Sequence, residues 1–341
     1  MKKKILSFIL IFTMCIGLIP KDTKADSEVY IYRISGGDRF ETSVEVSNVS
    51  YKKSENAVLV SGRKHPDGLT GGVLASVLNG PVLLTEKDSV PTSVKNEINR
   101  LGVKNIYIVG GTNSVSKKVE SSLSGYNIKR IDGSDRTETA TNVANFIRTL
   151  TDYTSNTRYF ALANENEFAD ALAVGGYLAN TKIPLLLTDN KTLSTNNKNF
   201  INKYNIGRAI IVGGTSSVSP KLIPNNVNYA TYSGSDRYKT SLDIAKKGFS
   251  NVKTVVVTSG EDFPDALSAS TLSKYVDGPI LLTNSKAIDS DIVKYIKNGN
   301  ITRLIVVGGK NKLPDKLLEV INKEQIRGPE EIGDINEPPK G

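Results

Sequence analysis

The sequence predicts an α/β protein made of three tandem three-layer modules, each with a mostly parallel sheet. Two observations lead to this fold class. One set of short motifs recurs three times along the chain at nearly constant spacing. Between the motifs, short apolar runs alternate with segments whose apolar residues follow a helical period. Apolar strands that are each followed by a helix are typical of a parallel sheet covered on both faces, with right-handed crossovers.

Residues 1–25 have the pattern of a secretory signal peptide. Three lysines follow Met1, and the apolar stretch from Ile5 to Ile19 comes next. Small residues at Thr23 and Ala25 suit cleavage after Ala25. The apolar stretch is shorter than the roughly 20 residues needed to cross a bilayer. We therefore expect a secreted mature chain that has no membrane contact after cleavage.

The composition of the mature chain limits its chemistry. Its only cysteine lies in the predicted signal peptide, so disulfides are not expected and packed cores must provide stability. Removal of five lysines and one aspartate with that peptide lowers the formal net charge from +9 to +5. This mild excess suits an anionic partner such as a wall polymer. It lacks the clustered basic residues of a nucleic-acid-binding surface, so no nucleic acid is expected.

Four motifs make up each copy. They are a Gly-x-Asp-Arg turn, an Asp-Ala-Leu helix start (Asp-Gly-Leu in copy one), a Pro-x-Leu-Leu-Thr strand and a Val-Gly-Gly turn. The Asp of the second motif precedes the Thr of the third by 18 residues in every copy, and that Thr precedes the first Gly by 25. Only the segment from Arg to Asp varies, because copy two has six more residues around Thr151–Thr157. Such constant spacing indicates one repeated structural unit, with a longer loop in copy two.

The elements of copy one can be predicted in order. We expect a helix over Thr42–Val49, a strand over Ala57–Val60, a helix over Leu69–Leu78, a strand over Val82–Thr85, a helix over Ser93–Leu101 and a strand over Ile106–Val109. A further strand precedes each Asp-Arg turn, at Tyr30–Ile34, Ile128–Ile131 and Tyr229–Tyr232. Each of these strands could complete the sheet before it or the sheet after it. In the first case Tyr30–Ile34 would dock on copy three and close a ring.

The predicted organisation divides the mature chain at the motifs. Module 1 is expected over residues 26–127, module 2 over 128–228 and module 3 over 229–326. The last helix is expected over Asp315–Ile321. Residues 327–341 hold four acidic residues and three prolines without an apolar period, and we expect a disordered tail there.

These motifs, repeated three times behind a signal peptide, resemble the cell-wall-binding type 2 repeat family of Gram-positive, clostridial-type surface wall proteins. The resemblance covers about residues 30–325. It implies non-covalent anchoring to the wall through an anionic polysaccharide, modules arranged with pseudo-threefold symmetry, and a secreted protein associated with the cell surface and S-layer. The resemblance also suggests other surface-layer proteins as a further class of partner. The resemblance also implies that the aliphatic triplet before each Thr is needed for anchoring.

Candidate polymer-binding residues are the recurrent polar and glycine positions. Ligands of open parallel sheets bind outside the carboxyl ends of the strands, where the Asp loop, the Thr and the Gly-Gly turn are expected. Glycines let a backbone approach a ligand, N–H groups at the following helix start favour phosphate, and arginines can clamp anions. The candidates are Arg39, Arg136, Arg237, Asp67, Asp170, Asp265, Thr85, Thr188, Thr283, Gly110, Gly111, Gly213, Gly214, Gly308 and Gly309.

Each candidate also has a structural interpretation. The arginines could form ion pairs with the neighbouring Asp or across a module interface, and the aspartates could cap helices. The triplets suit either a buried core or a contact surface; they are Val82, Leu83, Leu84, Leu185, Leu186, Leu187, Ile280, Leu281 and Leu282.

The sequence favours a binding protein over an enzyme. Zinc hydrolases use several His or Cys ligands, but the mature chain has His65 and no cysteine, so no metal or other cofactor is expected. Copies two and three have Phe168 and Phe263 in place of His65, which argues against a catalytic triad. A wall-modifying, amidase-like hydrolase and a structural surface-coat or adhesin protein stay as alternatives.

Overall fold

The computed structural model describes residues 28–151, 158–323 and 325–333. The predicted signal peptide and residues 152–157 of the longer loop in copy two lie outside this part of the chain. The predicted elements of copy one are confirmed within a few residues of their ends, and the helix from His65 begins four residues earlier than predicted.

Three four-stranded parallel sheets form the framework, and each sheet with its helices defines one module. Module 1 has the sheet order β3-β2-β4-β5, module 2 has β7-β6-β8-β9, and module 3 has β11-β10-β12-β1. The strands of module 1 are β2 (Asn56–Ser61), β3 (Val82–Thr85), β4 (Asn105–Val109) and β5 (Asn127–Ile131). Those of module 2 are β6 (Tyr159–Asn164), β7 (Leu185–Thr188), β8 (Arg208–Val212) and β9 (Asn228–Tyr232). Those of module 3 are β10 (Thr254–Ser259), β11 (Ile280–Thr283), β12 (Arg303–Val307) and β1 (Tyr30–Ile34).

Helices separate the strands in every copy. Copy one contributes α1 (Arg39–Ser50), α2 (His65–Val77), α3 (Thr92–Leu101) and α4 (Lys117–Ser122). Copy two contributes α5 (Arg136–Leu150), α6 (Phe168–Thr181), α7 (Thr195–Lys203) and the short 3₁₀ turn η2 (Pro220–Leu222). Copy three contributes α8 (Arg237–Gly248), α9 (Pro264–Val276), α10 (Ser290–Asn298) and α11 (Asp315–Leu318), and η3 (Pro329–Glu331) follows. No helix in the described residues has the length and hydropathy that a bilayer crossing requires.

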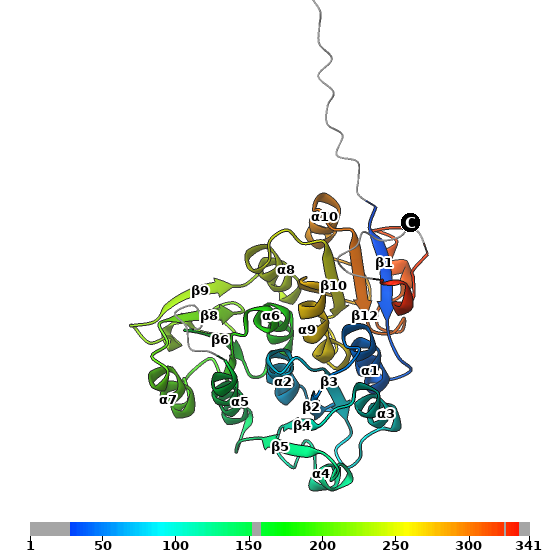
Figure 1. Cartoon of the computed structure of the whole chain (residues 1–341). Helices are drawn as coiled ribbons and strands as arrows, with labels where there is room; N and C mark the ends of the chain where they lie inside the picture. The colour runs from blue at the N-terminus through cyan, green and yellow to red at the C-terminus, as the bar shows by residue number, and fades with distance from the viewer. Residues whose placement is uncertain (1–27, 152–157, 324, 334–341) are drawn as a thin grey trace, which may run out of the picture.

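The first strand closes the three modules into a ring. β1 pairs in parallel with β12 over its full length, from Tyr30 opposite Arg303 to Ile34 opposite Val307. β5 and β9 likewise complete the sheets of the copies that precede them. Figure 1 shows β1, in blue, beside β12, in orange. The ring arrangement is therefore confirmed, and the predicted module boundaries are corrected, because the strands after residues 127 and 228 belong to the preceding sheets.

The centre of the ring is formed by one helix from each copy. α2, α6 and α9 pack against one another, as Figure 1 shows, in a pseudo-threefold arrangement. Small residues permit the close approach, since a Cβ on Gly72 would lie 2.2 Å from the Ser270 hydroxyl. Most of the buried apolar side chains of the three copies form one continuous cluster around these helices.

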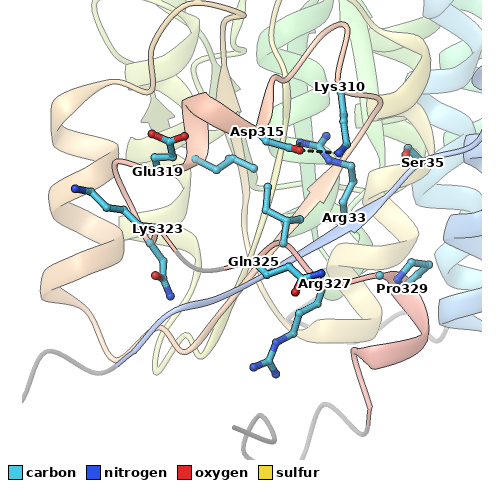
Figure 2. Close-up of a pocket in the computed structure, with 13 residues that line it drawn as sticks. Arg33, Ser35, Lys310, Asp315, Glu319, Lys323, Gln325, Arg327 and Pro329 are labelled. Atoms are coloured by element: carbon cyan, nitrogen blue, oxygen red, sulfur yellow. Dashed lines mark hydrogen bonds and ion pairs between the residues drawn. The ribbon is translucent and has the colours of Figure 1, made fainter.

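The predicted disorder after residue 327 is wrong for the first part of that segment. The Arg327 N–H donates to the Ile31 carbonyl at 2.9 Å, and the Arg33 N–H donates to the Arg327 carbonyl at 3.0 Å. Ile332 is buried in the core. A backbone that pairs with the outer edge of β1 gains order that its composition does not reveal. Figure 2 shows this segment, with Gln325, Arg327 and Pro329, running along β1. Residues 334–341 lie outside the described part of the chain.

Candidate functional site

The Asp-Arg turn begins a helix in every copy. The Asp38 carboxylate accepts 2.8 Å hydrogen bonds from the N–H groups of Phe40 and Glu41, which makes it the N-cap of α1. Asp135 and Asp236 cap α5 and α8 in the same way. The turn is therefore fixed by local hydrogen bonds before any ligand is considered.

The arginine of each turn ties the helix to a neighbouring loop. The Arg39 guanidinium donates to the Gly62 carbonyl at 2.7 Å, and Arg237 does so to Gly260 at 2.6 Å. Arg136 donates to the Glu165 carbonyl at 3.2 Å. Each Arg thus has a structural role, but its partner is a backbone carbonyl of the same copy and not the adjacent Asp.

Strand assignment places each Asp-Arg turn at a junction between two modules. β5 ends at Ile131 in the sheet of module 1, so Asp132–Arg136 lie at the carboxyl end of that sheet. A cleft of about 320 Å³ forms there between copies one and two. Its lining includes Lys64, Asp67, Gly111, Ser114, Asp132, Asp135, Arg136 and Thr139.

The other two junctions bring the same motifs together. Between copies two and three, a cleft of about 460 Å³ is lined by residues that include Asp170, Gly214, Ser217, Asp236, Arg237 and Thr240. Between copies three and one, burial raises the pKa of Asp265, and Thr42 and Arg39 of copy one lie close enough to oppose that rise. Ring closure therefore creates the third junction from opposite ends of the sequence.

The recurrent aspartates lie over the first glycine of each Gly-Gly turn. Gly110 has φ +113°, and a Cβ there would be 2.3 Å from Oδ2 of Asp67. The corresponding distances are 2.5 Å for Gly213 and Asp170, and 3.0 Å for Gly308 and Asp265. The first glycine is thus required by its backbone conformation and by the close approach of a carboxylate.

The expected capping role of these aspartates is wrong. α2, α6 and α9 begin two or one residues earlier, with Lys64, Glu167 and Phe263 at the N-cap and no side-chain cap hydrogen bond. Each aspartate instead lies in the first turn, where it also faces the next copy.

Burial raises the pKa of all three aspartates. For Asp67, desolvation is the largest cause, and Ser114, Lys64 and Arg136 oppose it. Asp170 and Asp265 follow the same pattern, opposed by Thr240 and Arg237 and by Thr42 and Arg39 respectively. The positive charge of the Arg in the following copy thus opposes the rise in pKa of each carboxyl group. The charges of two modules are therefore coupled across the junction.

The second glycine of each turn is open. No heavy atom would lie within 4 Å of a Cβ on Gly111 or Gly309, and only the Ser216 hydroxyl, at 3.9 Å, would approach one on Gly214. The following helices do not begin at the glycines, since α4 starts at Lys117 and a tight turn from Gly111 to Val115 precedes it. The expectation that a helix start directly follows the Gly-Gly turn is therefore corrected.

The threonines and the aliphatic triplets lie away from the clefts. The Thr85 hydroxyl donates to the Ser89 carbonyl at 2.9 Å, and Thr188 donates to Thr192 at 3.0 Å; Thr283 similarly closes the loop to Ala287. All three threonines and all nine triplet residues are at most 1% exposed. These positions hold the second strand and its loop in the core and offer no surface to a polymer.

The described residues contain no group of three or more His, Cys, Asp and Glu side chains placed to hold a metal ion. The structure brings together motifs from different copies at each junction. The sequence shows that each turn follows the carboxyl end of a strand, but it does not show which sheet that strand joins.

Three copies of one α/β unit, closed into a ring with the same polar junction repeated, define a tandem-repeat binding protein. The chain belongs to the cell wall binding domain 2 (CWB2) family, whose family model matches residues 33–120, 130–223 and 231–318. It therefore carries three wall-binding repeats, which agrees with the motifs and with the fold.

Relatives of known name share the repeats but are longer. The N-acetylmuramoyl-L-alanine amidase LytC of Bacillus subtilis (strain 168) is 30% identical over 314 residues, which cover 91% of this chain and 62% of that protein. The amidase enhancer of the same organism is 28% identical over 261 residues, or 75% of this chain and 35% of that protein.

Among solved structures, Cwp6 from Clostridium difficile superimposes with a TM-score of 0.80 at 25% identity, covering 92% of this chain and 52% of that one. Cwp8 from the same organism gives 0.75 at 29%, covering 87% and 53%. The chain thus spans between about one third and two thirds of these relatives.

Proposed function

We propose that the chain attaches non-covalently to the bacterial wall by binding an anionic secondary wall polymer at its three module junctions. The observation that carries this proposal is the repeated cleft, in which the Asp and Gly-Gly turn of one copy meet the Asp-Arg turn of the next. Membership in a wall-binding family supports the same function.

The charges around the junctions suit an acidic saccharide polymer. Lys64 and Arg136 stand near Asp67 in the first junction, Arg237 near Asp170 in the second, and Arg39 and Lys312 near Asp265 in the third. Cations attract the polymer's anionic groups, and the carboxyl and hydroxyl groups can accept or donate hydrogen bonds to its sugars. Three such sites on one rigid ring would hold one polymer strongly even where each site binds weakly.

The proposal places the protein at the cell surface after secretion, and it leaves room for contacts with other surface-layer proteins. It assigns no catalytic step to this chain. Because one relative is an amidase, the alternative function of a wall hydrolase should be tested, although the match covers 62% of that relative. Purified protein run in a zymogram on wall material should leave no cleared band, and a cleared band would show wall-hydrolase activity.

The open second glycine allows a sharp test of the binding site. Gly111→Asp and Gly214→Asp place a negative charge in the first and second clefts without a steric clash, and Gly309→Asp does so at the third junction. The triple Asp variant should bind isolated walls at least about tenfold more weakly than the matched triple Asn variant, because only the former repels an anion. Walls stripped of anionic polymer should bind neither. Equal binding of both variants to intact walls would contradict the proposal.

A further inference from the structure

Module 2 has a second cavity, which lies away from the junction clefts. It has a volume of about 600 Å³ and is lined by four tyrosines: Tyr159, Tyr177, Tyr229 and Tyr232. Arg208 and Asn228 are also part of its wall. Tyr159, Arg208 and Asn228 are the first residues of β6, β8 and β9, so the cavity opens toward the amino ends of these strands. The junction clefts lie at the opposite, carboxyl ends.

The same place is filled in the sister modules. Ala230 of β9 corresponds in register to Lys129 of β5 and to Tyr32 of β1. Lys129 covers the ring of Phe146 with its Nζ at 4.0 Å from the centroid, and Tyr32 is fully buried. The small Ala230 side chain leaves this volume open in module 2.

The helix beside the cavity also differs from its counterpart in module 1. Counting from the N-cap aspartates, Lys247 of α8 takes the place that Phe146 has on α5. Lys247 pairs with Asp243 at 2.7 Å and its Nζ lies 5.8 Å from the centroid of the Tyr232 ring, whereas Phe146 packs its ring on Tyr107. An aliphatic side chain thus replaces an aromatic ring on the helix beside the cavity, in addition to the small residue at Ala230.

All four tyrosines occur only in module 2, and Tyr229 takes the place of Ile128 and Ile31. Tyr177 takes the place of Leu74 and Leu272, and Tyr232 takes the place of Ile131 and Ile34. Tyr159 takes the place of Asn56 and Thr254. All four changes exchange a smaller side chain for a ring with a hydroxyl group, and all four converge on the cavity that Ala230 opens.

The walls combine aromatic faces with polar groups. The rings of Tyr177 and Tyr232 meet edge to face with centroids 5.7 Å apart. The Arg208 guanidinium lies 5.4 Å from the Tyr159 ring centroid and donates to its phenolic oxygen. Tyr229 is 51% exposed at the rim, an unusual exposure for so large a ring.

We propose that this cavity binds a neutral pyranose unit of a saccharide. A pyranose ring presents an apolar C–H face that packs on aromatic rings, and hydroxyl groups that need the donors and acceptors of Tyr, Arg and Asn side chains. The volume lies within the range of small-molecule sites. The proposal does not depend on the junction clefts, since it concerns the other end of one module and an uncharged ligand.

Saturation-transfer NMR with a panel of hexoses and N-acetylhexosamines, added to the full mature chain, tests the proposal. At least one sugar should receive saturation from tyrosine ring protons. Ala230→Tyr, which introduces the residue of β1, should fill the cavity and abolish the signal. Tyr177→Leu, which introduces the residue of both sister copies, should weaken binding about tenfold. Ala230→Ser adds little volume and serves as the matched control that keeps binding.

Thermal unfolding checks that each variant is folded. Binding of the variants to intact walls then distinguishes loss of the sugar site from loss of the junction clefts. Wall-polymer binding through the clefts should persist in Ala230→Tyr. Tyr229→Ala, at the exposed rim, is a second variant that keeps the core intact, and it should also weaken the sugar signal. No signal from any sugar of the panel would overturn the proposal. So would a signal unchanged in Ala230→Tyr, or binding of phenol without binding of any sugar.

Discussion

Arg33 of the first strand and Asp315 of the last helix form an ion pair with an N–O distance of 2.9 Å across 282 positions of the sequence. The Arg33 guanidinium also donates to the carbonyls of Gly308 and Leu313 at 2.6 and 2.7 Å. In module 1, Arg130 contacts Gly110, Val115 and Glu120 in the same manner. β1 therefore occupies in module 3 the place that β5 occupies in module 1, down to its side-chain contacts; Figure 2 shows Arg33 beside Asp315 and Lys310.

Deletion of Asp26–Ser35 should unfold part of module 3 and leave module 1 folded. The deletion removes β1, whose backbone pairs with β12, and exposes the edge of that strand. Hydrogen exchange followed by mass spectrometry should show lost protection in Arg303–Val307 and retained protection in Asn105–Val109. Loss confined to the sheet of module 1 would contradict the ring.

Attachment should weaken stepwise as the junctions are altered one by one. We expect one Gly→Asp substitution among Gly111, Gly214 and Gly309 to lower wall binding modestly, and each further one to lower it by a larger factor, because the sites act on one polymer. Co-sedimentation with purified walls measures this, and added salt should weaken every variant that still binds. The Asn series is the control. A single substitution that abolishes binding would point to one dominant site.

The two glycines of one turn should differ sharply in their tolerance of a side chain. Gly110→Ala combines φ +113° with a Cβ 2.3 Å from the Asp67 carboxylate and should lower the free energy of unfolding by about 1–3 kcal/mol. Gly111→Ala meets no atom within 4 Å and should change it by less than about 0.5 kcal/mol. Urea unfolding of both variants gives the comparison, and equal destabilisation would show that the turn differs from the one described here.

The buried junction aspartates should make the protein less stable as the pH rises. Because burial raises the pKa of Asp170 above the model-compound value of 3.8, the folded state binds its proton more tightly than the unfolded state. The free energy of unfolding should therefore fall as the pH rises from 3.8 through the raised pKa, and then level off. Asp170→Asn should remove this contribution, as urea unfolding across that pH range would show.

Asp135 provides a control of opposite sign. Hydrogen bonds from the Glu138 N–H and the Thr137 hydroxyl lower its pKa, so its stabilisation is present above pH 3.8 and is lost as the pH falls through the lowered pKa. Asp135→Asn should therefore remove stability at neutral pH but not at low pH. If both variants show the same pH dependence, burial does not govern Asp170.

The sequence predicted the repeating fold because each element carries its own local pattern, as Val82–Thr85 does with four consecutive buried residues. It left the place of Tyr30–Ile34 open, since strand pairing is a long-range choice that local residues do not encode. Order in the segment around Ile332 was missed for the same reason, because the preceding turn η3 packs on β1 and α1, which are distant in sequence.

The site was predicted in its parts and not in its assembly. Asp67, Gly111 and Arg136 were all expected to contribute, but their meeting in one cleft depends on which sheet β5 joins. Thr85 was misplaced because a recurrent polar residue at a strand end can serve its own loop as readily as a ligand. The tyrosine cavity carried a readable signal, since Tyr177 departs from the leucines of the other two copies.

Closure by β1 also determines how many repeats such a chain can hold. In an open solenoid each added repeat extends the stack and leaves the earlier contacts unchanged. Here a fourth copy could not be appended without separating β1 from β12 and widening the angle at every junction around α2, α6 and α9. Repeat number is thus a property of the rotational symmetry of the assembly, and gain or loss of a copy would require a new architecture and not merely a longer or shorter chain.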